Sequence, residues 1–417
     1  MAMKGRTCAA LAAFSLALSA QDGDSRWKVG GFGTLGLAWS STRDAEFIRE
    51  PSQPRGTARR FDPNTDSRLG LQLNVRLSEH FSAVGQVVSR YRYDATYTPD
   101  LTWAFLNYAP MPELQIRLGR VGWDVFQLAD TRNVGYSYLW VRPPVDFYGP
   151  LQVTCMDGGD VAWTESLGAQ RTLRMKVAAG RASSVDQIGV AASGPRVTLA
   201  GTKIVGATVE YQQDTLNLRA AWALAEPTRN YPKPFSDLQE GMMAFAQMLH
   251  DPRLEAEAVN LNFRGTRFNY YSLGTTWEPS PVRVESALAM SHASSGPVPD
   301  MKMGYVSLGY RWGATVPYLM VSRLLSERPD IYVGNLPYLG PQGQALAQGY
   351  MEYRTGQRGE QTTWSAGCRW DFHSKMALKF QMDRVFAEPS ARMLWRNVSP
   401  SWNGQATIAS VMLDFVF

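Results

Sequence analysis

The chain has 417 residues, of which 45% are hydrophobic, 12% aromatic and 19% charged, with a net charge of +5 at pH 7. This balance excludes collagen, coiled coils and disordered tails, and the weak charge gives no indication of nucleic-acid binding. Beyond the N-terminus no run of 18 apolar residues occurs, which excludes a bundle of membrane-spanning helices. A membrane β-barrel stays compatible, because its strands expose lipid-facing side chains only at every second position.

Residues 1–20 have the pattern of a secretory signal peptide. Two basic residues precede an apolar, alanine-rich stretch, and small residues offer cleavage after Ser19 or Ala20. Removing the two basic residues lowers the net charge from +5 to +3. We therefore expect an exported mature chain over residues 21–417, with a short buried helix at the N-terminus as the alternative.

The mature chain consists of segments of about ten residues in which apolar and polar side chains alternate. In the segment 66–77, Leu69, Leu71 and Leu73 fall on one face and Gln72 falls on the other. Such an alternation gives a strand one lipid face and one wet face. Counting these runs predicts about sixteen strands, at 27–39, 66–77, 81–93, 101–109, 113–120, 157–166, 171–181, 197–212 (or a later start), 215–225, 265–278, 281–292, 301–312, 315–324, 361–372, 374–386 and 406–417.

The connections between these segments alternate in length. Tight turns such as 78–80 and 213–214 alternate with long connections such as 226–264 and 325–360. Outer-membrane barrels sort their loops in this way, with short periplasmic turns and long extracellular loops. The sequence therefore predicts an all-β fold, a transmembrane antiparallel β-barrel of about sixteen strands. A soluble all-β lectin or sandwich is the alternative.

The segment 406–417 alternates up to a terminal phenylalanine. This end resembles the assembly signal of Gram-negative outer-membrane barrels, and the resemblance assigns that role to Phe415 and Phe417. The strand number, the loop order and the segments 30–36 and 66–72 resemble the sixteen-stranded trimeric porins. The resemblance implies a location in the cell outer membrane and a homotrimer. It also implies contacts with outer-membrane lipid, lipopolysaccharide and the barrel-assembly machinery.

A barrel of this size is wide enough to hold an aqueous channel. On the predicted alternation, basic side chains outnumber acidic ones on the inner face, so the wall is expected to be net basic. Charges on a pore wall can set the sign of the ions that pass most easily. The alternative is that these charges only keep the lumen hydrated. The candidate pore-lining residues are Arg68, Arg76, Arg90, Arg92, Arg117, Arg174, Lys176, Arg219 and Lys379.

The third long connection, residues 121–156, is rich in aromatic residues and contains Pro143 and Pro144. In porins this connection folds into the barrel and narrows it, and the resemblance implies the same here; an outward lid or a trimer contact is the alternative. The Gly-rich acidic motif common in general porins is missing, so cation selectivity is not implied. Opposed charges at a constriction create a transverse field, and the candidates for it are Asp124, Asp130, Arg132, Arg142 and Asp146.

The fifth long connection, residues 226–264, carries a predicted helix. Ser236 and Gln239 have the spacing of a capping box, and Leu238 and Met242 begin a run of apolar residues at helical spacing. We expect this insert to pack on the barrel mouth.

No catalytic, cofactor or metal site is expected. The histidines are scattered singly, and Cys155 and Cys368 show no metal-ligand spacing, although they could form a disulfide. The leading hypothesis is a porin for passive diffusion of small hydrophilic solutes and ions. The alternatives are a substrate-selective, anion-preferring channel, a loop-based adhesin or receptor, and an outer-membrane hydrolase, for which no Gly-x-Ser-x-Gly motif is present.

Overall fold

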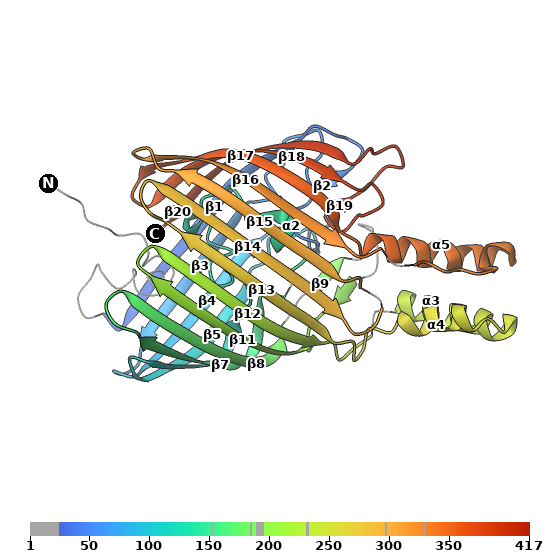
Figure 1. Ribbon diagram of the computed structural model, residues 1–417, viewed down its shortest axis with the longest axis horizontal. Coiled ribbons are helices and arrows are strands. Elements are labelled where there is room, and N and C mark those ends of the chain that lie inside the picture. Colours follow the sequence, from blue (N-terminus) through green and yellow to red (C-terminus); the bar gives the residue numbers. More distant parts are fainter. Residues whose placement is uncertain are drawn as a thin grey trace.

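The computed structural model describes residues 25–151, 153–183, 186–188, 196–230, 233–296, 298–328 and 330–417. The predicted signal peptide, residues 1–20, lies outside these ranges. Within them, sixteen antiparallel strands close into one barrel, so the predicted fold is confirmed (Figure 1). The barrel strands are β1 (Trp27–Ser40), β3 (Arg68–Arg76), β4 (Phe81–Arg90), β5 (Asp100–Met111), β6 (Leu114–Gly122), β7 (Cys155–Ser166), β8 (Arg171–Ala182), β11 (Lys203–Gln213), β12 (Leu216–Glu226), β13 (Phe268–Trp277), β14 (Val282–Ala293), β15 (Met301–Tyr310), β16 (Thr315–Ser326), β17 (Glu360–His373), β18 (Met376–Ala387) and β20 (Gln405–Val416).

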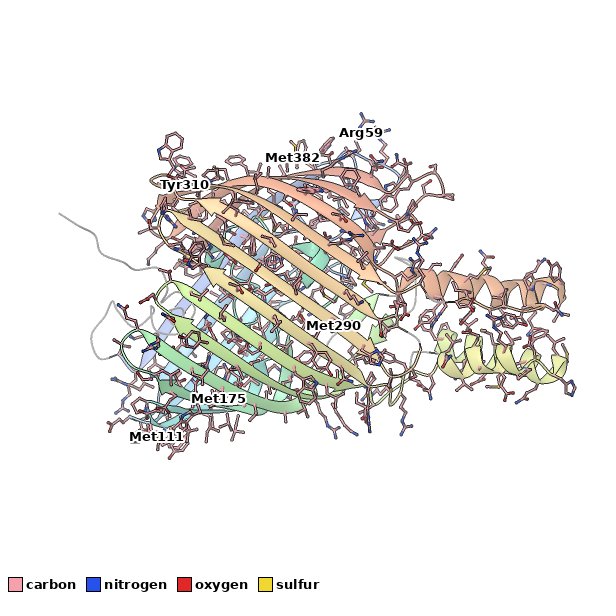
Figure 2. All side chains as sticks on the ribbon, in the orientation of Figure 1. Arg59, Met111, Met175, Met290, Tyr310 and Met382 are labelled. Atoms are coloured by element: carbon pink, nitrogen blue, oxygen red, sulfur yellow. The ribbon has the colours of Figure 1, made fainter. Side chains whose placement is uncertain are left out.

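The side chains of the barrel strands alternate between an inner and an outer face. In β3, the outer side chain of Leu71 is 45% exposed, whereas the inner Gln72 is 4% exposed. Met175, Met290 and Met382 are likewise exposed on the outer face of the wall (Figure 2). A continuous belt of exposed apolar side chains is stable only against another apolar phase, so the outer wall is suited to lipid.

The barrel closes where β1 pairs with β20. At the short-turn end of this seam, the backbones of Gly31 and Phe417 exchange two hydrogen bonds of 2.9 and 3.0 Å. The rings of Phe417 and Phe415 lie over Gly31 and Gly33, where an added Cβ would come within 2.4 and 2.3 Å of them. The two glycines therefore leave room for the aromatic side chains that cover the seam.

Two short sheets stand apart from the barrel wall. β2 (Glu46–Phe47) pairs with β19 (Trp395–Arg396) and joins the first long loop to the last one. β9 (Asp186–Ile188) pairs with β10 (Arg196–Thr198), so the strand predicted at 197–212 is divided and its barrel part begins at Lys203. The possible disulfide is not formed, because Cys155 and Cys368 are both free.

Three helices project from the long-loop end of the barrel (Figure 1). They are α3 (Lys233–Leu249), α4 (Pro252–Asn260) and α5 (Gly340–Gly356), of which the sequence predicted only the first. Among the described residues, no helix is both long and apolar enough to cross a bilayer.

The helical insert departs from the prediction in two respects. α3 begins at Lys233, before Ser236, and the Ser236 hydroxyl donates to the carbonyl of Lys233 at 2.9 Å, so the predicted capping box is wrong. The predicted packing on the barrel mouth is also wrong, because Met242 of α3 is buried in a cluster with Leu254 of α4 and Tyr350 of α5. The apolar face of the insert is thus covered by the other two helices.

Candidate channel lumen

The connection between β6 and β7, residues 123–154, runs inside the barrel, and we call it the inner loop. Trp140 Nε1 donates to Ser307 Oγ of β15 at 2.8 Å, and Ser272 Oγ of β13 donates to the carbonyl of Val125 at 2.8 Å. Most described side chains of the loop are buried. Because β13 and β15 lie far around the barrel from β6 and β7, the loop crosses the interior.

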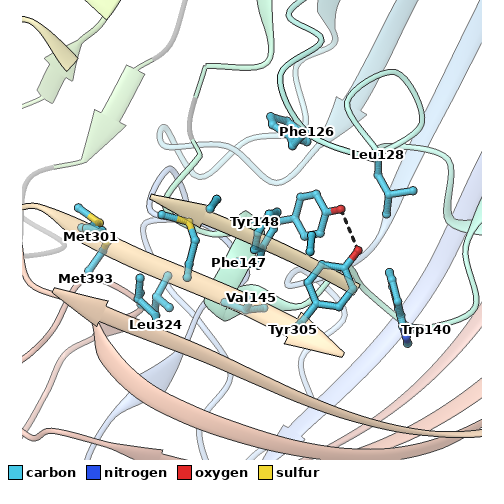
Figure 3. Close-up of a cluster of buried hydrophobic side chains, with 14 of the residues drawn as sticks. Phe126, Leu128, Trp140, Val145, Phe147, Tyr148, Met301, Tyr305, Leu324 and Met393 are labelled. Carbon is cyan, nitrogen blue, oxygen red and sulfur yellow. Dashed lines mark hydrogen bonds between the residues drawn. The ribbon is translucent and has the colours of Figure 1, made fainter. Parts of the chain in front are cut away.

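An aromatic cluster packs the inner loop against one half of the wall (Figure 3). The ring of Tyr305, from β15, lies 5.4 Å from the ring of Trp140 and 5.3 Å from that of Phe147, both edge to face. The hydroxyl of Tyr148, which ends the short helix α2 (Val145–Tyr148), lies 3.4 Å from the Tyr305 hydroxyl. Each such ring pair adds about 0.5–1.5 kcal/mol beyond its burial. This half of the barrel is therefore filled by side chains.

Arg142 anchors the middle of the inner loop to the wall. Its Nε and Nη2 atoms donate to the carboxylate of Asp66 at 2.7–3.2 Å, and its Nη1 atom donates to Asp383 of β18 at 3.0 Å. Nη2 also donates to Ser410 Oγ of β20 at 2.6 Å. All four side chains are buried. The predicted constriction residue Arg142 is thus neutralised by carboxylates on either side of the barrel seam.

Asp124 fastens the start of the inner loop to the wall, and Lys379 binds its middle. Asp124 accepts hydrogen bonds from Lys176 of β8 and Arg219 of β12. Lys379 of β18 forms an ion pair with Asp414 at 2.9 Å and donates to three carbonyl groups of the loop, those of residues 135, 138 and 140. Three of the predicted pore-lining cations therefore secure the loop, and each has a carboxylate partner.

Asp146 is, after Asp124, the second buried carboxylate that the inner loop brings to the wall. It accepts hydrogen bonds from Ser322 Oγ at 2.7 Å, from Thr363 Oγ1 at 3.2 Å and from the amide of Gln361. Burial raises the pKa of the Asp146 carboxyl to about 6, and the three hydrogen bonds offset this only in part. Burial thus favours the protonated form of Asp146 in the folded protein, although its three hydrogen bonds favour the ionised form.

This raised pKa predicts a pH dependence of stability. A carboxyl whose pKa is raised by folding contributes stability at low pH that is lost as the pH rises from 3.8 to about 6. For Asp146 the loss amounts to about 3 kcal/mol. We expect the free energy of unfolding of the native protein to fall between pH 4 and pH 7 relative to that of the variant Asp146→Asn. Parallel unfolding curves for the two proteins over this range would contradict the assignment.

The first long loop adds Arg49 and Glu50, which the sequence analysis missed, to the predicted site residues Arg90 and Arg132. Glu50 accepts from Arg90 Nη1 of β4 at 2.7 Å and from Arg132 Nη2 of the inner loop at 3.2 Å. Arg49 Nη1 lies 3.2 Å from an Asp66 carboxylate oxygen. Burial alone would raise the pKa of Glu50, but the surrounding arginines, led by Arg90 and Arg132, lower it to about 2. Glu50 is therefore ionised at any physiological pH.

Arg68 completes this cluster, and it forms no ion pair within the described ranges. Its Nη1 atom donates to Asn133 Oδ1 at 3.3 Å and its Nε atom donates to the carbonyl of Asp66 at 3.2 Å. Arg49, Arg68, Arg90 and Arg132 thus gather beside the single carboxylate of Glu50, with Asp66 shared with Arg142. We call these four residues the arginine cluster, and it carries a positive charge excess.

The remaining predicted site residues lie apart from the arginine cluster. Arg117 of β6 forms a bidentate pair with Asp160 of β7, with its shortest contact at 2.6 Å. Arg92 lies beyond the end of β4 and pairs with Asp100 at 2.5 Å. Arg76 lies at the short-turn end of β3, and Arg174 donates a hydrogen bond to Gln115 at 3.1 Å. Asp130 belongs to the inner loop, and its Oδ1 atom has no hydrogen-bond partner in the described part of the chain.

Polar side chains cover the wall opposite the aromatic cluster. Gln86 Nε2 of β4 donates to Gln72 Oε1 of β3 at 2.8 Å, and Gln115 Nε2 of β6 donates to Asn107 Oδ1 of β5 at 2.8 Å. We call these four residues the amide wall. Its strands β3 to β6 lie across the barrel from β14 to β16, to which the inner loop is packed. The interior is therefore filled mainly by apolar side chains toward β14 to β16 and is mainly polar toward β3 to β6, where Val134 of the inner loop still packs on Val88 of β4.

Comparisons with known proteins identify the fold. No family model and no curated protein sequence matches the chain. Among solved structures, it is similar to OmpF of Salmonella typhi in complex with daunomycin, with a TM-score of 0.53 and 14% identity over 94% of this chain and 97% of the other. It is also similar to the outer membrane channel DcaP of Acinetobacter baumannii, with a TM-score of 0.53 and 10% identity over 94% of this chain and 97% of the other. OmpT of Vibrio cholerae is similar too, with a TM-score of 0.51 and 10% identity over 94% of this chain and 99% of the other. The chain thus has the fold of the porin-like, sixteen-stranded barrels of Gram-negative outer membranes.

Proposed function

We propose that the protein is an outer-membrane channel for the passive diffusion of small hydrophilic solutes and ions. The division of the barrel interior carries this proposal. The aromatic cluster of the inner loop packs on the side of β14 to β16, whereas β3 to β6 carry the amide wall, in which Asn107 and Gln115 are partly exposed. Amide and guanidinium groups on a pore wall keep water and small polar solutes hydrated during passage.

The arginine cluster favours anions as the preferred ions of this channel. Arg68 and Arg90 project from β3 and β4, the strands that also begin the amide wall. The four arginines carry more positive charge than Glu50 and Asp66 carry negative charge, and Asp66 also pairs with Arg142. The excess charge acts over about 8 Å at physiological salt, which is enough to bias a narrow passage. An anion-preferring, substrate-selective channel is therefore the second candidate function.

Replacing Arg68 and Arg90 by glutamine tests the anion preference. We expect the double variant to keep its conductance in planar bilayers, while its zero-current potential in a salt gradient shifts toward cations, because two charges leave the polar side of the lumen. The shift should be partial, since Arg49 and Arg132 remain. Arg92→Gln is the matched control, because Arg92 pairs with Asp100 beyond the end of β4 and should change the potential little. Equal zero-current potentials for the double variant and the native channel would show that the arginine cluster does not set the ion selectivity.

We also propose that the chain assembles as a homotrimer with the help of the barrel-assembly machinery. The aromatic side chains of Phe415 and Phe417 support the assembly step. Their ring centroids lie 6.3 Å apart, and the two rings cover the seam between β1 and β20 that closes the barrel. The belt of exposed apolar side chains supports contacts with lipid and with neighbouring copies.

A further inference from the structure

Glu50 begins a tight turn in the first long loop. The backbone N–H of Gln53 donates to the carbonyl of Glu50 at 3.0 Å, and Pro51 occupies the second position of this turn. A proline at this position presets the backbone of a turn. Arg396 of the last long loop is buried and donates to the carbonyl groups of Pro51 and Gln53. The Glu50 side chain therefore projects from a backbone that contacts between two loops hold in place.

Two guanidinium groups bind the two carboxylate oxygens of Glu50 separately. Oε1 accepts from Arg90 Nη1 at 2.7 Å, and Oε2 accepts from Arg132 Nη2 at 3.2 Å. Arg132 Nη1 also donates to the carbonyl of Leu151 at 2.6 Å, which fixes the position of this guanidinium group. Planar groups with two oxygens match donors arranged in this way. The pair of arginines thus has the geometry that recognises a carboxylate.

The arginine cluster holds more positive charge than Glu50 neutralises. Arg68 lies directly opposite Arg90 in the register of β3 and β4. Arg68 is buried, and its partners are Asn133 and a backbone carbonyl, with no ion pair to any residue in the described ranges. Neutral acceptors compensate a buried charge only in part. The cluster therefore attracts carboxylates from outside the chain.

The site is open to solutes on one side. The side chains of Arg90 and Glu50 are 23% and 11% exposed, whereas that of Arg132 is 6% exposed. Arg90 ends β4 at the long-loop end of the wall, and Gln86 of the amide wall lies deeper on the same strand. A solute that enters from the long loops therefore meets Arg90 before it reaches the amide wall.

We propose that Glu50 is the internal occupant of a binding site for carboxylate solutes, which enter the channel by displacing it from Arg90 and Arg132. The proposal rests on the channel function and names the class of solute that the arginine cluster takes. When a solute carboxylate binds, that of Glu50 turns away, so the charge beside the two arginines is unchanged. Conduction requires a site that also releases its solute, and a competing carboxylate favours release.

The test is the single-channel chloride current in planar bilayers, recorded while propanoate is added. Propanoate has the same carbon chain and carboxylate as the Glu50 side chain. We expect propanoate to reduce the chloride current of Glu50→Gln at about tenfold lower concentration than that of the native channel, because the internal competitor is gone. Asp44→Asn is the matched control, since it removes one negative charge from an exposed position of the same loop. It should respond to propanoate like the native channel.

Two further variants identify the groups that bind the solute. Glu50→Asp keeps the charge but shortens the side chain, so its sensitivity to propanoate should lie between those of the native channel and Glu50→Gln. This variant also carries the comparison if the uncharged one fails to fold. Glu50→Gln with Arg90→Gln removes one donor from the vacant site, and it should lose the tenfold gain in sensitivity.

Three outcomes would count against the proposal. Equal sensitivity of the native channel and Glu50→Gln to propanoate would overturn it, although the channel function would stand. Equal reduction of the Glu50→Gln current by phosphate and by propanoate would also overturn it, because the site would then respond to charge alone. A native protein without any chloride current would contradict the channel function and this site together.

Discussion

Replacing Arg142 by methionine should release the inner loop from the barrel wall. The substitution leaves the buried carboxylate of Asp383 without a cation and removes the principal partner of Asp66. Removing one partner from a buried ion pair costs about 3–5 kcal/mol, since the remaining charge is stranded in a poorly solvated place. We expect a lower unfolding temperature and a larger, noisier single-channel conductance, measured by heat modifiability and planar-bilayer recording.

A matched variant separates the charge effect from lost packing. In Arg142→Met with Asp383→Asn the stranded charge beside β18 is removed as well, so part of the stability should return. The conductance should stay high in this variant, because the loop is still detached from both carboxylates. Unfolding and conductance like those of the native channel in Arg142→Met would show that the aromatic cluster alone holds the loop.

Replacing Leu71 by arginine should strongly impair the barrel. Leu71 lies in the middle of β3 with its side chain 45% exposed on the outer face. A charge at this depth costs about 2–4 kcal/mol when the wall is surrounded by lipid. We expect a lower yield of folded, heat-modifiable protein in outer membranes and weaker resistance to urea.

Asn74 of the same strand is the matched control. Its side chain lies on the inner face and is only partly buried, so Asn74→Arg should cost far less than Leu71→Arg. The neighbouring Gln72 is a poorer control, because it is 4% exposed and bonded to Gln86. Similar losses for Leu71→Arg and Asn74→Arg would contradict the assignment of the two faces.

The strands could be predicted because their pattern is local. In β3, the alternation of leucine with polar residues is set by which face each side chain meets, and a barrel imposes the same rule on every strand. The weakly patterned segments 157–166 and 315–324 also form strands, β7 and β16. The strand predicted at 197–212 has the later of its two predicted starts, at Lys203, because residues that join the small β9–β10 sheet have the same alternation as the barrel wall.

The partners of the lumen charges could not be predicted from alternation. It indicates that Arg117 faces inward, but not that Asp160 on the next strand neutralises it. The ion pairs of the arginine cluster are even harder to predict, because Glu50 and Arg132 come from two loops that meet only in the folded barrel. Loop residues have no period, and their burial is decided by the fold around them.

Helix α5 escaped the sequence analysis for a related reason. It buries Gly343, Ala347, Tyr350 and Tyr353 at helical spacing, but two of these are small and two are tyrosines, so the apolar stripe is weak in the sequence. Its stability depends on α3 and α4, which belong to a different loop. A pattern search within one segment cannot detect such a shared core.

The seam between β1 and β20 has a consequence for biosynthesis. Thr34 and Asp414 form a hydrogen bond across it although they are 380 residues apart, so the ring can close only after nearly every strand has been made. Contacts between such distant parts of a chain form slowly. A chain interrupted anywhere before β20 keeps two unpaired strand edges, which recruit other chains. We therefore expect truncated products to aggregate and be degraded instead of forming smaller pores.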